Sequence, residues 1–222
     1  RRLGRQNAAY DAQTAKVIER VVKPGGVCID VGAHKGEILK EIVKRAPDEP
    51  HIAFEPLPYF AEMLREKFPG LRHFEACATD ETGKSAFNFV ENDPGYSGLK
   101  RRVYDRPDPI VTELEVDLLR IDDVVDPDRR VSFLKIDVEG AELSVLRGAE
   151  ETIRRDRPLV IFEAGRKSSG VYGVTAGDFF DFFEGAGMGL YTPLRWLAGK
   201  RPFRRAEYTA SWSRDYYFVA YA

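Results

Sequence analysis

The chain has 222 residues, and its 34 Lys and Arg against 36 Asp and Glu leave a formal net charge of −2. A balance so close to neutral gives no overall basic field, which argues against a protein that binds nucleic acid through its net charge. Hydrophobic residues make up 43% of the chain and charged residues 32%, a composition that excludes disordered and fibrous proteins. We expect one folded domain over residues 1–222.

The number of cysteines and the length of the apolar runs bear on where in the cell the protein works. The two cysteines, Cys28 and Cys77, both lie in apolar runs and cannot build a disulfide framework, so we expect a reduced, cytoplasmic protein. No apolar stretch approaches the roughly 20 residues that a membrane span needs. Arg1 stands where an initiator Met would, without an apolar signal core behind it, so we expect a trimmed start rather than a targeting peptide.

The first half of the chain alternates helix and strand patterns. We predict helices over 9–22, 37–45 and 59–67, and strands over 27–31, 51–55 and 71–77. The strands are short, nearly continuous apolar runs of the kind that is buried on both faces of a parallel sheet. Their alternation with helices predicts right-handed crossovers and an α/β fold with helices on both faces.

The second half begins with turn signals between residues 79 and 109, around a small strand over 87–90 and a mobile loop. We then predict strands over 111–116, 131–137, 159–163, 190–192 and 216–221, and helices over 118–125, 141–154 and 175–186.

Acidic residues end several of the predicted strands, namely Asp30, Glu55, Asp137 and Glu163. Ligands bind at the carboxyl ends of the strands in open α/β sheets, so these acids should line one crevice. Asp30 and Asp137 could alternatively cap the helices that follow them.

The turn after the first strand, residues 30–36, has glycines where backbone must approach a ligand, and it opens a helix. It is not a dinucleotide fingerprint, because His34 stands where a second glycine would admit a pyrophosphate. Glu55, at the end of the second strand, stands where a carboxylate accepts hydrogen bonds from ribose hydroxyls. These features together predict a nucleoside cofactor without a pyrophosphate.

The run Phe-Leu-Lys-Ile-Asp-Val-Glu-Gly-Ala-Glu over 133–142, continued by Val-Leu-Arg-Gly-Ala over 145–149, resembles the FkbM family of class I S-adenosylmethionine-dependent methyltransferases. The resemblance extends from about Tyr10 to Glu163. It implies a Rossmann-like sheet of seven mostly parallel strands with the last strand antiparallel. It also implies S-adenosylmethionine as the donor, and a hydroxyl acceptor on a sugar, polyketide or other small metabolite.

Within the single domain we expect an N-terminal helix region (1–26), a cofactor-binding core (27–163) and a C-terminal acceptor-side region (164–222), of which the last lies beyond the resemblance. Within the core it implies that Gly32, Ala33 and Gly36 line the methionine and ribose portion and that Glu55 holds the ribose. The turn over 75–78 would flank adenine, and Asp137 would face the amino-acid end. His34 and Lys35 depart from the small residues more common in the family. The predicted cofactor-binding residues are Asp30, Gly32, Ala33, Lys35, Gly36, Glu55, Pro56, Ala76, Cys77, Ala78, Ser97 and Asp137.

A hydroxyl acceptor must lose its proton, and the candidate bases are Glu163, His34 and Glu139. Glu139 could instead serve only the dipole of the following helix, and His34 could be a substrate contact or an ordinary loop residue. Asp137, Glu139 and Glu163 could together ligate Mg²⁺, but acids at helix starts need no metal to account for them, so we expect none.

Rival functions remain open from the sequence alone. They are a methyltransferase acting on nitrogen, protein or RNA, and a non-catalytic nucleoside-binding module or nucleotide oxidoreductase. A segment rich in Arg and aromatic residues over 195–212 could grip an acidic acceptor or RNA, or could be a solvated loop. We expect a small-molecule acceptor and no nucleic acid, and the sequence carries no signal for an oligomeric state.

Overall fold

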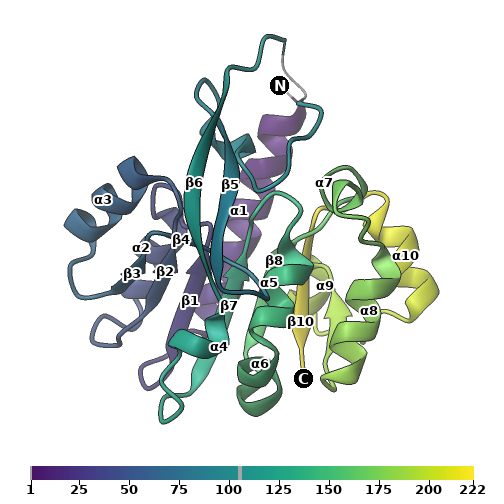
Figure 1. Ribbon diagram of the computed structural model, residues 1–222. Coiled ribbons are helices and arrows are strands. Elements are labelled where there is room, and N and C mark those ends of the chain that lie inside the picture. Colours follow the sequence, from purple (N-terminus) through teal and green to yellow (C-terminus); the bar gives the residue numbers. More distant parts are fainter. Residues whose placement is uncertain (1, 105–106) are drawn as a thin grey trace.

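The computed structural model describes residues 2–104 and 107–222, with side chains from Ala9 onward. Its centre is a seven-stranded sheet with the strand order β3-β2-β1-β7-β8-β10-β9 (Figure 1). The strands of this sheet are β1 (Val27–Val31), β2 (Ile52–Phe54), β3 (Arg72–Phe74), β7 (Val131–Ile136), β8 (Leu159–Glu163), β9 (Gly189–Tyr191) and β10 (Tyr217–Tyr221).

Only β10 runs against its neighbours, since it pairs in antiparallel fashion with β8 and with β9. β1 pairs in parallel with β2 on one side and β7 on the other, and β7 pairs in parallel with β8. The predicted α/β fold with an antiparallel last strand is confirmed. This topology brings the carboxyl ends of β1, β2, β7 and β8 to one edge of the sheet.

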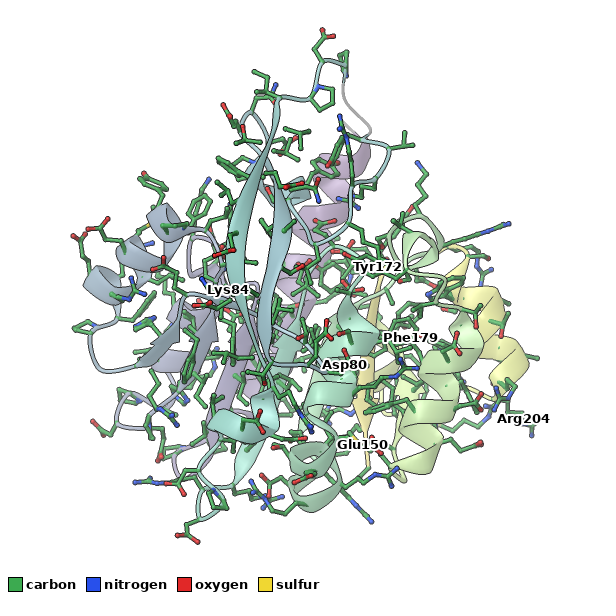
Figure 2. The ribbon with its side chains drawn as sticks, viewed as in Figure 1. Asp80, Lys84, Glu150, Tyr172, Phe179 and Arg204 are labelled. Atoms are coloured by element: carbon green, nitrogen blue, oxygen red, sulfur yellow. The ribbon has the colours of Figure 1, made fainter. Side chains whose placement is uncertain are left out.

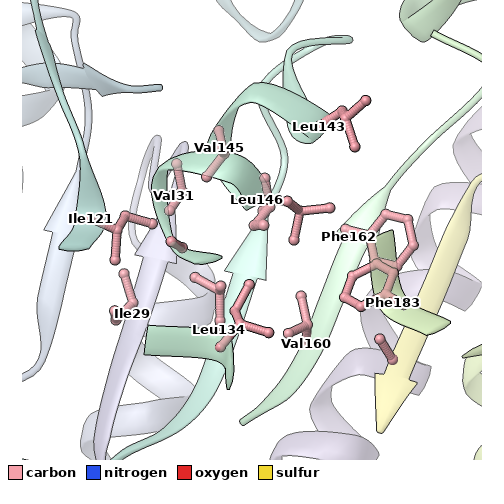
Figure 3. Packing of buried hydrophobic residues seen from close by; sticks show 14 of the residues in the cluster. Ile29, Val31, Ile121, Leu134, Leu143, Val145, Leu146, Val160, Phe162 and Phe183 are labelled. Atoms are coloured by element: carbon pink, nitrogen blue, oxygen red, sulfur yellow. The ribbon is translucent and has the colours of Figure 1, made fainter. Parts of the chain in front are cut away.

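Side chains that alternate along the strands divide the core between the two faces of the sheet. One face carries Ile29, Leu134 and Phe162, which pack with Leu146 and Phe183 from the helices (Figure 3). The helices that contribute buried residues to this face are α4 (Ile121–Val124), α5 (Glu142–Gly148), α6 (Glu150–Asp156), α8 (Ala176–Gly185) and α10 (Arg205–Trp212).

The opposite face carries Cys28, Phe133 and Ile161, against Ile18 and Ile42 from the helices. The helices packed here are α1 (Arg2–Val21), α2 (Glu37–Val43) and α9 (Pro193–Leu197). A smaller cluster joins α2 to α3 (Pro58–Lys67) through Leu39, Ala53 and Leu64. Helices on both faces therefore cover the strands, as the apolar runs predict.

A second, three-stranded sheet was not predicted. The expected strand over 71–77 is broken at Glu75, whose carboxylate points outward to Arg65 (2.9 Å). β3 stays in the main sheet, while β4 (Ala76–Ala78) pairs with β6 (Val111–Leu119), which also pairs with β5 (Gly83–Val90). The hairpin of β5 and β6 extends beyond the main sheet (Figure 1).

Two predicted helices differ from those in the structure. The helix over 141–154 is divided at Ala149 into α5 and α6. Gly148 packs there so closely on residue 79 that a Cβ would lie 1.8 Å from the Thr79 carbonyl oxygen. The helix over 118–125 shortens to α4, because Leu118 and Leu119 continue β6.

The C-terminal segment contains helices that were not predicted. α7 (Arg166–Val171) follows β8, and the basic-aromatic segment folds into α9 and α10 rather than an open loop. Two of its arginines form ion pairs within the protein: Arg201 with Glu207 at 2.7 Å, and Arg205 with Asp181. Among the described helices, none is both long and apolar enough for a membrane crossing.

Candidate active site

A cavity of about 960 Å³ opens at the carboxyl ends of β1, β2, β7 and β8. Its walls come from these strand ends, from β4, from the middle of α1, from α2, and from the segment that follows β5. Outer contacts hold that segment, since Tyr172, which directly follows α7 (Figure 2), accepts a hydrogen bond from the Lys100 N–H at 3.1 Å. The predicted crevice is therefore a pocket at the carboxyl ends of the strands, and the segment after β5 forms part of its wall.

The turn after β1 is held in place from two sides. The N–H groups of Gly32 and Ala33 donate to the Phe54 carbonyl at 3.0 and 3.1 Å, and Lys135 Nζ donates to the Gly32 carbonyl at 2.8 Å. Gly32 has a φ of 74°, and a Cβ there would lie 2.0 Å from the Asp137 carbonyl oxygen. Only glycine fits this position, which lets the turn run directly over the end of β7.

Lys135 is a site residue that the sequence analysis missed. It lies opposite Asp30 in the register of β1 and β7, and its Nζ is 3.2 Å from Asp30 Oδ1 and 3.9 Å from Asp137 Oδ2. Burial opposes its charge, but Asp30 and Asp137 together raise its pKa. A lysine inside an otherwise apolar buried strand is the signal that could have identified it.

Glu55 is oriented by two backbone groups. Its Oε2 accepts from the His34 N–H at 2.8 Å and its Oε1 from the Leu57 N–H at 3.0 Å. Burial raises its pKa and these two hydrogen bonds oppose that change. Each carboxylate oxygen keeps a further lone pair, and the residue lines the cavity. The geometry suits a carboxylate that accepts hydrogen bonds from both hydroxyls of a ribose.

The wall beside Glu55 is small and apolar. Pro56 and the short strand β4 line the cavity here, and Leu57 and Phe87, each 5% exposed, close it from behind. Burial raises the pKa of the Cys77 thiol to about 12, so this thiol stays neutral. An uncharged, mostly apolar wall of this kind fits an adenine ring.

Three carboxyl groups meet on the other side of the turn. Asp137, Glu139 and Glu163 each offer an oxygen within 4.8 Å of the other two. The Tyr217 hydroxyl donates to Asp137 Oδ2 at 2.6 Å, and Arg102 forms an ion pair with Glu139. Part of the cluster's hydrogen-bonding capacity is therefore already used by groups of the protein.

The charges in this cluster are unequal. Burial opposes ionisation of Asp137, but Lys135 and hydrogen bonds from Glu163 and Tyr217 outweigh it and lower the pKa of Asp137. Burial, and then the neighbouring Asp137 and Glu139, raise the pKa of Glu163 well above its ordinary value. The pKa of Glu139 rises to about 8 for the same kinds of reason, burial first and Asp137 second.

Glu139 also has an unusual backbone. Its φ of 60° lies in the left-handed region, where a residue with a Cβ is held only by its surroundings. The following turn is closed by Glu142, whose Oε1 accepts from the N–H groups of Gly140 (2.9 Å) and Val138 (3.2 Å). The Glu139 carboxylate pairs with Arg102, whose guanidinium lies 4.8 Å from the Tyr96 ring centroid.

Most of the residues predicted for the site do surround the cavity. The predicted residues that line it are Gly32, Ala33, His34, Glu55, Pro56, Ala76, Cys77, Ala78, Ser97, Asp137, Glu139 and Glu163. Asp30, Lys35 and Gly36 do not line it: Asp30 lies beneath the turn against Lys135, Lys35 is exposed, and Gly36 caps α2. Ser97 directs its hydroxyl oxygen to the Val90 N–H at 3.0 Å.

Further wall residues were not predicted. Tyr10, Asp11 and Thr14 reach the cavity from α1, Arg102 from the segment after β5, and Tyr217 from β10. Of the predicted acceptor-side region, 164–222, only the start of α7 and the start of β10 contribute to the wall. No sequence signal marks Tyr217, because only the antiparallel pairing of β10 brings it to Asp137.

The seven-stranded sheet with its antiparallel β10 is the fold of class I methyltransferases. A model of the methyltransferase FkbM domain matches residues 30–187, so the chain belongs to the FkbM methyltransferase family. The resemblance found in the sequence is confirmed, and S-adenosylmethionine is the cofactor of this family.

Individual curated relatives share only about a quarter of the aligned residues with this chain. The chain is 27% identical over 155 residues to the methyltransferase sdnD of Sordaria araneosa, covering 55% of this chain and 60% of that protein. It is 25% identical over 163 residues to the 2-O-methyltransferase NoeI of Sinorhizobium fredii (strain NBRC 101917 / NGR234), covering 64% and 65%. The chain thus spans about three fifths of the length of these curated relatives.

A solved structure shares the fold. The methyltransferase FkbM from Methylobacillus flagellatus KT superposes with a TM-score of 0.53 at 18% identity, covering 93% of this chain and 50% of that one.

Proposed function

We propose that the protein transfers the methyl group of S-adenosylmethionine to a hydroxyl group of a small, sugar-like metabolite. The observation that carries this proposal is the single cavity in which a ribose-type carboxylate, Glu55, and a cluster of carboxyl groups around Asp137 face the same turn. The printed activity of one relative, a 2-O-methyltransferase, agrees with a hydroxyl acceptor.

The residues present fit the donor. Glu55 would hold the ribose, β4 and Pro56 would flank the adenine, and the turn at Gly32 would support the methionine portion. Asp137 would face the positively charged end of the amino acid. When bound, S-adenosylmethionine supplies a methyl group that its sulfonium already activates, so the protein has to align the two substrates and exclude water.

The remaining cavity is suited to a small acceptor. A volume of about 960 Å³ lies at the upper end of the usual range for small-molecule pockets, roughly 300–1,000 Å³, which allows a donor and a compact acceptor together. Tyr10, Asp11 and Thr14 of α1 provide hydrogen-bonding groups on this wall. We place the acceptor there, between α1 and the segment that carries Arg102.

We assign the general base to Glu163. The His34 ring packs on the Phe60 ring, with 4.3 Å between the ring centroids, and Glu139 forms an ion pair with Arg102. Glu163, in contrast, lines the cavity from the end of β8. Burial and Lys35 lower the pKa of His34, which leaves a neutral imidazole that could still contact substrate.

A nucleic-acid acceptor is not favoured. Two arginines of the C-terminal segment, Arg201 and Arg205, pair with Glu207 and Asp181, and no residue of 195–212 lines the cavity. Both cysteines are unpaired, in keeping with the reducing cytoplasmic setting that we propose.

The experiment that tests the proposal is incubation of the protein with candidate sugars, glycans and polyketides and a donor carrying a CD₃ group. Mass spectrometry should show a gain of the labelled methyl group at a hydroxyl. The Glu163→Gln variant should lose turnover by about 10²- to 10⁴-fold, the usual contribution of a placed base. Transfer only to amines, or to no small molecule, would contradict the proposal.

A further inference from the structure

Asp137 and Glu163 both line the cavity and offer carboxylate oxygens within 4.8 Å of each other, close enough for a hydrogen bond between the two groups to shift their pKa values. An ionised carboxylate can only accept hydrogen bonds, so contact between two carboxyl groups requires a proton on one of them. The two residues come from the ends of neighbouring parallel strands, β7 and β8. The fold therefore builds a carboxyl pair that holds one proton.

Tyr217 decides which partner holds this proton. It is the direct cross-strand neighbour of Glu163 in the β8–β10 pairing, yet its hydroxyl donates to Asp137 Oδ2 at 2.6 Å. Lys135 Nζ also lies 3.9 Å from that oxygen. Asp137 is thus stabilised as the carboxylate by two donors of the protein, and the proton remains on Glu163.

Other charged groups also act on the pair. Lys135 and His34 favour the ionised form of Asp137, whereas Glu139 and Glu142 disfavour that of Glu163. Asp30 and Asp11 lie near enough to interact with Asp137, and Arg102 forms an ion pair with Glu139. Without a ligand, negative groups dominate around Glu163, and a new positive charge in the cavity would favour its ionisation.

We propose that binding of the cationic methyl donor expels the proton of the Asp137–Glu163 pair to solvent, which converts Glu163 into a carboxylate base, and that Tyr217 is the positioning residue that keeps Asp137 from taking the proton up. This inference rests on the proposed function, because it assumes that the donor's sulfonium lies on the Gly32 side of the cavity, next to Asp137.

Both the Glu163 proton and the acceptor proton are accounted for in this scheme. On binding, the O–H bond of Glu163 breaks and its proton passes to buffer. In turnover, the acceptor O–H proton passes to Glu163 while the S–CH₃ bond breaks with its electrons remaining on sulfur and the O–CH₃ bond forms. Because Glu163 is protonated until the donor binds, the resting protein does not bury a second negative charge beside Asp137.

The test is calorimetric titration of the whole chain with S-adenosylmethionine at pH 7 in buffers of different ionisation enthalpy, which counts the protons released. We expect release approaching one proton for S-adenosylmethionine and clearly less for S-adenosylhomocysteine, which lacks the sulfonium charge. Glu163→Gln should bind the donor without this release. Tyr217→Phe should reduce the release at pH 7 and restore it at higher pH, while Tyr221→Phe, which removes a hydroxyl from the same strand β10 outside the cavity lining, should behave as the wild type.

Two results would overturn the inference. The first is donor binding with no proton release, or with equal release for both ligands, and this result leaves the proposed methyl transfer standing. The second is release that survives in Glu163→Gln and disappears in Glu139→Gln, which would assign the proton to Glu139. Absence of donor binding would overturn both this inference and the proposed function.

Discussion

Lys135 Nζ lies 2.8 Å from the Gly32 carbonyl oxygen and 3.2 Å from Asp30 Oδ1, so one buried cation joins the end of β7 to the turn that follows β1. Replacing it with Met would remove the only positive partner that the ion pairs of the described residues give to the fully buried Asp30. Breaking a buried pair from one side costs about 3–5 kcal/mol. We expect Lys135→Met to lower the free energy of unfolding in urea by that amount, and Asp30→Asn/Lys135→Met to recover part of it. Equal stability of the single and double variants would show that Asp30 does not depend on Lys135.

Glu55 provides the most direct mutational test of ribose recognition. Glu55→Gln keeps the size and one acceptor oxygen but loses the charge, and hydrogen bonds to a charged group contribute about 1.5–3 kcal/mol. We expect affinity for S-adenosylmethionine, measured by calorimetry, to fall about 10- to 100-fold. Glu75→Gln is the control, because that carboxylate points outward to Arg65 and its loss should leave affinity unchanged. Unaltered binding by Glu55→Gln would remove the ribose assignment.

Glu142 should make stability depend on pH. Burial raises its pKa to about 7, above the value near 4.5 of an unfolded chain, so its contribution is present in full at low pH and is lost as the pH rises through 7. We expect Glu142→Gln to unfold like the wild type at pH 5 and to be more stable at pH 8, by up to about 3 kcal/mol. Urea unfolding at the two pH values measures this difference. A variant equally destabilised at both would instead indicate that packing dominates.

Gly148 should tolerate no side chain. A Cβ there would lie 1.8 Å from the Thr79 carbonyl oxygen, and overpacking of this kind costs about 1–3 kcal/mol. Gly170 in α7 is the matched control, because a Cβ there would meet nothing within 4 Å and Ala favours a helix by up to about 1 kcal/mol. We expect Gly148→Ala to lower the melting temperature and Gly170→Ala to raise it slightly. Similar effects at both positions would contradict the close approach of α5 to β4.

The main sheet was predictable because each of its central strands is a short apolar run with its own flanking signals, as Val27–Val31 and Leu159–Glu163 show with unchanged bounds. The break at Glu75 was not predictable, since it depends on β6 drawing β4 away into a second sheet. The helix break at Ala149 depends in the same way on a tertiary contact, between Gly148 and Thr79. Local pattern carries no information about such contacts.

The residues of the candidate site also differ in whether local sequence pattern could predict them. Residues such as Glu55 and Asp137 were found because they end strands, and all parallel strand ends meet at one edge. Tyr217 and Arg102 were missed because an antiparallel strand and a long loop bring them in from distant parts of the chain. Lys135 stood inside the motif that identified the family, but its contact with the turn at Gly32 is visible only in three dimensions.

The central claim is that this pocket holds an adenosyl cofactor, and a crystal structure of the protein with S-adenosylhomocysteine tests it most directly. We predict both ribose hydroxyls within hydrogen-bond distance of the Glu55 carboxylate, with the adenine against β4 and the amino-acid end beside Gly32 and Asp137. Density for the compound away from these residues, or a pocket that stays empty at saturating ligand, would contradict the account.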